Sequence, residues 1–166
     1  MNAGKILRVE YLTRGVLMKR FMLFAVLLMA VSTGSYAENL KFRDVQGKWS
    51  LMFRGNYGYE FRFSKSYRAI CILYLLSSSL IFKGVYTIEE GNKLRINISE
   101  MKNEESVNGL NLSKKFVKTT SSYFVFQAEV RKEKKGKMLV LRPQKIFIDG
   151  NNSEGYFEPE IKLESR

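Results

Sequence analysis

The sequence predicts an all-β protein in which eight short strands form an up-and-down antiparallel barrel or sandwich after an N-terminal export signal. Two observations support this fold class. A hairpin over residues 80–99 alternates apolar and polar residues on both arms. From Gly47 onward, further short alternating segments follow one another, separated mostly by short turns. We expect a closed eight-stranded β-barrel, because closure removes the exposed edges that an open sheet leaves.

The hairpin is the clearest element of the chain. In its second arm Leu94, Ile96 and Ile98 share one face, and the residues between them are polar. This period of two is typical of a half-buried strand. The intervening residues 89–92 read Glu-Glu-Gly-Asn, and Gly and Asn tolerate the positive φ angles that turns require.

Residues 1–37 are predicted to precede the folded domain. A basic start at Met18 is followed by the apolar run 21–31 and by a small, polar segment ending at Ala37, which is the pattern of a secretory signal peptide. A membrane anchor is the rival interpretation, but the run is shorter than the roughly 20 residues that a spanning helix needs. We therefore expect residues 1–17 to lie upstream of the true start. The domain, residues 38–166, is expected to be exported to the periplasm or the extracellular space and not to be an integral membrane protein once processed.

Composition describes one basic domain with a single thiol. Residues 38–166 hold 23 lysines and arginines against 15 acidic residues, a formal charge of +8. This excess of positive charge favours binding to an anionic surface, although it also keeps a protein soluble. Cys71 cannot form an internal disulfide, and its apolar neighbours predict a buried core position.

The remaining segments are expected in chain order. Residues 101–121 are polar and are predicted to form a loop or a short helix, and residues 145–148 a short separate arm after Pro143. The segment 67–76 is apolar on both faces, so we expect its outer face to be covered. The other strands are predicted over residues 47–54, 57–64, 122–131, 138–142 and 156–165.

The start of the first strand resembles the lipocalins, in particular small bacterial lipocalin-like barrels. Gly47-Lys48-Trp49 matches the Gly-x-Trp motif of that family, whose Trp closes the floor of an eight-stranded barrel. The 80–99 hairpin has a similar layout. The last-strand arginine that packs on the family's Trp has only Arg142 and Arg166 as stand-ins, and the chain lacks a disulfide. An ordinary core Trp after a turn Gly is the alternative interpretation.

The inward-facing aromatic residues are the candidate ligand site. They would line a pocket for a small hydrophobic or amphipathic molecule, or they would fill the interior, because an eight-stranded barrel is barely wide enough for a cavity. These candidates are Trp49, Tyr57, Tyr59, Phe61, Phe63, Tyr86, Phe124 and Phe126.

Catalytic, metal and cofactor sites are not expected. The chain has no His, which removes the commonest proton-transfer group and the usual partner of a Ser or Cys nucleophile. Zinc is disfavoured for the same reason. The segment from Asp149 superficially resembles a calcium loop, but Glu154 stands where the loop needs Gly, and an Asx-type turn explains it more simply.

The turn at 131–137 is the candidate anionic-surface contact. Such a run can touch lipid headgroups or polysaccharide, or it can be a solvated turn. Nucleic acid is disfavoured, because no aromatic residues alternate with these charges. The basic residues are Arg131, Lys132, Lys134, Lys135 and Lys137.

Two functional hypotheses follow. The first is a non-catalytic, lipocalin-like carrier or sensor of a small apolar ligand. The second is an envelope interaction protein with a solid core, which contacts a protein, an anionic glycan or a lipid. A cavity would favour the first, and a packed interior with an apolar patch over Leu73 and Leu75 the second. An outer-membrane barrel is a third option, but its strands are longer and carry a continuous apolar outer band.

Overall fold

The computed structural model describes residues 39–54, 57–107, 110–113, 115–134 and 136–166. Residues 38–166 form one compact unit. The export signal and the start at Met18 lie outside the described residues. The described part contains no helix long and apolar enough to cross a membrane. The elements are α2 (Phe42–Val45), β1 (Gly47–Met52), β2 (Gly58–Phe63), β3 (Arg68–Leu75), β4 (Ser78–Glu89), β5 (Lys93–Val107), β6 (Leu110–Ser113), β7 (Val117–Glu133), β8 (Gly136–Ile148), β9 (Asn151–Asn152) and β10 (Ile161–Ser165).

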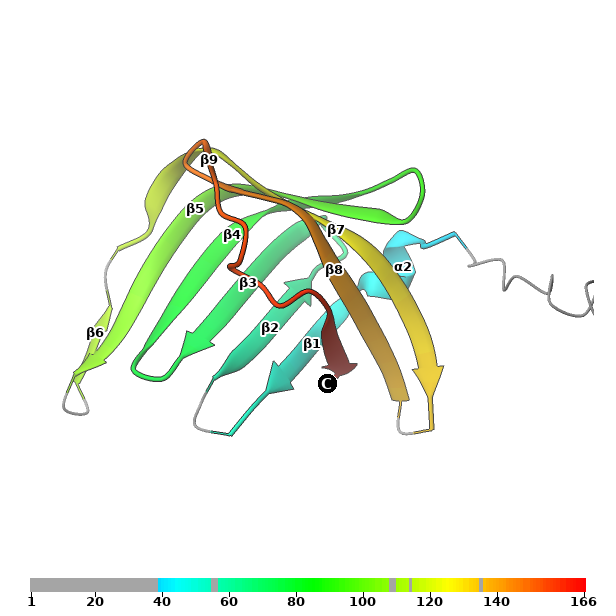
Figure 1. Cartoon of the computed structure of the whole chain (residues 1–166), viewed down its shortest axis with the longest axis horizontal. Helices are drawn as coiled ribbons and strands as arrows, with labels where there is room; N and C mark the ends of the chain where they lie inside the picture. Colours follow the sequence, from blue (N-terminus) through cyan, green and yellow to red (C-terminus); the bar gives the residue numbers. More distant parts are fainter. Residues whose placement is uncertain (1–38, 55–56, 108–109, 114, 135) are drawn as a thin grey trace, which may run out of the picture. The chain divides into compact units, whose positions relative to one another are not determined.

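The strands form a closed antiparallel barrel, as predicted. The eight strands of the barrel are β1, β2, β3, β4, β5, β7, β8 and β10, in that order. β10 pairs with both β8 and β1 and so closes the ring. At the seam Trp49 faces Ser165, and Leu163 faces Leu139. The short strands β6 and β9 add to β5 and β8 without entering the ring. Figure 1 shows β7 and β8 crossing in front of β1–β4 around a common interior.

The β4–β5 hairpin forms with its turn where the sequence predicts it. Its arms pair down to Glu89 opposite Lys93, and the turn holds Gly91 and Asn92 at positive φ angles of 72° and 60°. Leu94 and Ile96 are fully buried. Gly84 lies where β4 approaches its neighbour most closely, because a Cβ there would overlap the carbonyl oxygen of Asn97.

The loop or helix predicted for residues 101–121 is wrong. β5 runs on to Val107, and β7 begins at Val117. A register shift between Ile98 and Glu100 lets the strand continue, with Met101 opposite Phe82 on the inner side. Beyond this point the strand is held by pairing with β4 and β6 instead of by an apolar face, so its polar composition concealed it.

Two further boundaries differ from the sequence prediction. β8 is one strand past Pro143, because a register shift between Val125 and Phe126 on β7 accommodates the irregularity. The last strand begins at Ile161, not at residue 156. The residues before it cross the barrel as irregular chain, in which Gly155 adopts a φ of 94°.

Helix α2 closes one end of the barrel. The indole Nε1 of Trp49 donates a hydrogen bond of 2.6 Å to the carbonyl oxygen of Val45, which is fully buried. The ring of Phe42 contacts the ring of Tyr67 edge-on, with 4.8 Å between centroids. The backbone N–H of Leu40 donates to Oδ1 of Asn92 in the β4–β5 turn. We call this the closed end, and the opposite end, where residues 149–160 cross, the open end.

Candidate functional site

The eight aromatic candidates lie together inside the barrel. Seven of them are at most 3% exposed, and Tyr57 is half-buried near the open end. Their rings contact each other: the centroids of Phe63 and Tyr86 are 5.0 Å apart, and those of Phe61 and Phe126 are 5.9 Å apart. The described rings therefore fill this part of the interior instead of lining an empty space.

Phe157 is an interior aromatic residue that sequence reasoning did not count among the site candidates, and Phe82 is another. Phe157 was predicted only as one apolar residue of the last strand. The irregular crossing segment instead carries its ring into the barrel, where it is 6% exposed. Its centroid lies 5.3 Å from those of Phe124 and Phe126, 5.8 Å from that of Tyr59 and 6.2 Å from that of Phe61. Its position between Gly155 and Pro159, two residues that interrupt regular strands, is the signal that marks it in the sequence.

A hollow of about 380 Å³ lies at the open end beside Phe157. Its walls come from β8 and from the crossing segment, and most of the lining is apolar. The lining residues are Pro143, Gln144, Lys145, Ile146, Glu154, Gly155, Phe157 and Pro159.

A second hollow of about 320 Å³ lies where β7 diverges from β5. Met101 and Val117 line it together with Lys118 and Asp149. Asn103 also lines it, and its Oδ1 is buried without a hydrogen-bond partner. This second hollow is more polar in its residues than the first.

Buried hydroxyl and thiol groups in the wall are held in their neutral forms. Burial raises the pKa of Tyr59, and the hydrogen bond of 3.1 Å with the Tyr57 hydroxyl raises it further. The Tyr86 hydroxyl donates to the carbonyl oxygen of Ser64, and burial raises the pKa of Tyr86. Cys71 is a buried free thiol, as predicted, and burial raises its pKa strongly. None of these groups is prepared for nucleophilic or proton-transfer chemistry near neutral pH.

The outer face of β2 carries a compact ion cluster. Glu60 is buried and accepts from Nζ of Lys48 at 3.0 Å and from the guanidinium of Arg62. Burial alone would raise the pKa of Glu60, but the hydrogen bonds from Lys48 and Arg62 outweigh it, and the pKa lies below its ordinary value. The neighbouring Ile72 on β3 is only 7% exposed, whereas Ile70 and Tyr74 on the same face are half-buried, so the outer face of this strand is covered only in part.

The predicted apolar patch over the end of β3 is only partly formed. Leu73 points inward and is buried, whereas Leu75 and Leu76 are exposed. Arg142 does not pack on Trp49 in the way the lipocalin arginine packs on its Trp. Its guanidinium instead binds Glu160 at 2.6 Å on the outer face.

The turn that superficially resembles a calcium loop is closed by its own hydrogen bonds. Oδ1 of Asp149 accepts from the backbone N–H of Thr120, and the side chain of Asn151 donates to the carbonyl oxygen of Asp149. Over the described ranges, no group of three or more His, Cys, Asp or Glu residues is placed to hold a metal ion.

The basic turn lies at the closed end, at the tip of the β7–β8 hairpin. Arg131 is bound to Glu129 on the outer face through two hydrogen bonds of 2.8 Å. Lys132, Lys134 and Lys137 are exposed. Lys135, the fifth candidate, lies outside the described residues.

The chain is therefore a small protein built on a closed, antiparallel β-barrel. Comparison of the chain with protein-family models, with curated proteins and with solved structures found no match.

Proposed function

We propose that the chain is an exported, non-catalytic, lipocalin-like protein that binds a small apolar or amphipathic molecule at the open end of its barrel. The observation that supports this function is the hollow of about 380 Å³ beside Phe157. Its size falls within the range of about 300–1,000 Å³ for ligand pockets. Pro143, Ile146 and Pro159 supply apolar contacts there, and Lys145 stands beside them for a polar or anionic end of the molecule.

Phe157 gives such a molecule a route into the interior. Its ring contacts the rings of Phe124 and Phe126, and the chain that carries it forms no β-ladder. Moving the ring aside therefore breaks no ladder hydrogen bonds. An apolar group that replaces it meets the same rings of Phe124 and Phe126.

The test is native mass spectrometry of residues 38–166 purified from the envelope fraction of the source organism, followed by titration with an apolar fluorescent probe. A bound mass that is lost on denaturation, together with probe uptake, supports the proposal. Lys145→Trp fills the hollow and is expected to reduce probe affinity at least about tenfold, in line with the loss of most of the apolar contact area. Lys93→Trp makes the same change at an exposed residue of the closed end and serves as the matched control. A bare monomer without probe uptake refutes the proposal, and so does an equal loss in the two variants.

An envelope interaction protein is the second candidate function. The packed aromatic interior favours it, as do the exposed lysines at the tip of the β7–β8 hairpin. In this function the barrel is a rigid scaffold, and its binding chemistry lies on the outside.

A further inference from the structure

The tip of the β7–β8 hairpin places two like charges directly opposite each other. Lys132 and Lys137 are cross-strand partners, two residues beyond half-buried Val130 and fully buried Leu139 on the same face. Like charges in this position destabilise a sheet. Within the described part of the chain, neither ammonium group has a carboxylate partner. Anionic groups in the surroundings relieve this repulsion.

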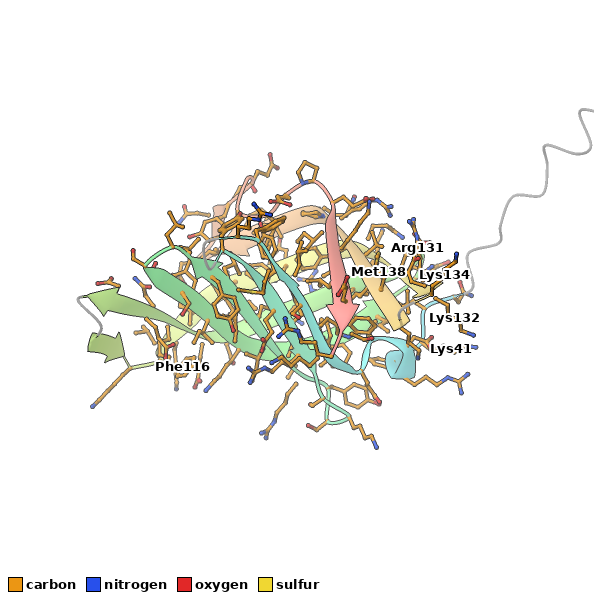
Figure 2. The ribbon with its side chains drawn as sticks, turned by 90° about the horizontal axis from the view of Figure 1, so that it is seen from below. Lys41, Phe116, Arg131, Lys132, Lys134 and Met138 are labelled. Atoms are coloured by element: carbon orange, nitrogen blue, oxygen red, sulfur yellow. The ribbon has the colours of Figure 1, made fainter. Side chains whose placement is uncertain are left out.

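The hairpin carries these charges past the end of the barrel. β7 pairs with β5 only as far as Gln127, whereas its pairing with β8 continues to Glu133. Figure 2 shows Lys132 and Lys134 toward the same end of the barrel as Lys41 and α2, whereas Phe116 lies at the opposite end. We define the basic rim as Lys132, Lys134 and Lys137.

The segment that crosses the open end is acidic. The crossing segment 149–160 contains four acidic residues and no lysine or arginine. An anionic surface attracts the lysines at the tip of the β7–β8 hairpin and repels these four carboxylates. Lys145 and Lys115 also lie at the open end, so only the crossing segment is acidic there.

We infer that the barrel docks through the basic rim on an anionic phospholipid surface, with its open end pointing away; this inference rests on the second candidate function. The chemistry of the rim favours lipid headgroups over a single built anion site. Its lysines are separate point charges without a shared pocket, and Arg131, the residue suited to bidentate phosphate binding, is engaged by Glu129. Laterally mobile headgroups adjust to such dispersed charges. The sequence predicts that the preceding segment, with its apolar run 21–31, directs the chain across a membrane.

The experiment is sedimentation of residues 38–166 with phosphatidylcholine vesicles that contain or lack phosphatidylglycerol, at low and at physiological salt. The test variant is Lys132→Glu with Lys134→Glu. Because each lysine near an anionic surface contributes about fivefold in binding, the variant should bind at least about 25-fold more weakly. The control, Arg54→Glu with Lys115→Glu, makes the same change of net charge at exposed residues of the open end, and it should stay within about twofold of the native protein because its charges face away from the surface.

Each other outcome overturns the inference. Equal binding to neutral vesicles refutes an electrostatic rim, and an equal loss in the control shows that only net charge matters. Retention on a sulfated polysaccharide without vesicle binding assigns the rim to a glycan. Probe uptake at the open end, measured on the same variant without vesicles, tests the ligand proposal separately. An unfolding midpoint at or above that of the native protein shows that the variant is folded.

Discussion

Truncation of Phe157 to Ala tests whether this ring completes the interior of the barrel. The substitution removes a ring with four aromatic neighbours at centroid distances of 5.3–6.2 Å. Phe→Ala in a packed core costs about 3–5 kcal/mol. We expect about 3 kcal/mol, the lower end of that range, because the space left behind joins the neighbouring hollow and water can enter it.

The assay is urea unfolding followed by the fluorescence of Trp49, the single Trp of the chain, and by circular dichroism. With a slope of about 1.5–2 kcal/mol per molar urea, the midpoint should fall by about 1.5–2 M. Phe147→Ala is the control, because that half-buried ring stacks only on Tyr123 at 4.9 Å and should cost about 1 kcal/mol. A loss for Phe157→Ala no larger than the loss for the control would refute the packing described here. The same variant should bind an apolar probe more tightly than the native protein, since the hollow gains the volume of the ring.

Three further substitutions test separate features of the fold. Acidification should reduce the free energy of unfolding through Glu60, because folding lowers the pKa of this carboxyl group. The stabilisation from Glu60 is complete above the ordinary pKa of 4.5 and is lost as the pH falls through the lower pKa of the folded state. Glu60→Gln should flatten this part of the stability profile, and an unchanged slope would contradict the assignment. Gly84→Ala should cost about 1–3 kcal/mol in urea unfolding, because its Cβ meets the backbone of Asn97; a neutral result would show that the strands separate easily. Lys132→Glu should raise stability by about 0.2–1 kcal/mol, because it replaces a like-charge pair with an ion pair to Lys137, and a lowered melting temperature would contradict this reasoning.

Local patterns were sufficient to predict the barrel. The β4–β5 hairpin needs only alternation around Leu94 and Ile96 and a turn that tolerates positive φ, and both are visible within twenty residues. The buried position of Cys71 follows in the same way from its immediate neighbours. Each strand of the barrel pairs mainly with the next barrel strand along the chain. Strands and turns that are predicted correctly one by one therefore already imply the closed ring.

The features that were missed depend on contacts between distant residues. The outer half of β5 is polar, and its pairing with β4 and β6 holds it in place. Helix α2 is a single turn whose position depends on Trp49 and on Asn92. Phe157 fills the interior because the closed ring surrounds it, and no periodicity within 149–160 indicates that. The basic turn was visible as composition, but the pairing of Lys132 with Lys137 required the register.

The two proposed surfaces lie on the same strand, which determines how they interact. Lys137 of the basic rim and Ile146 of the hollow are both on β8, about 30 Å apart at the rise of an extended strand. β8 pairs with β7 along almost its whole length and with β10 over residues 138–141, so we expect it to keep a single arrangement. Coupling between sites requires an element that both can bias between two states. We therefore expect the affinity of the open end for the probe to change by less than about twofold when anionic vesicles are added. Such a small change means that the coupling free energy between the two sites is close to zero. A larger change, measured by titrating the probe with and without phosphatidylglycerol vesicles, would show that the crossing segment around Phe157 moves when the closed end docks.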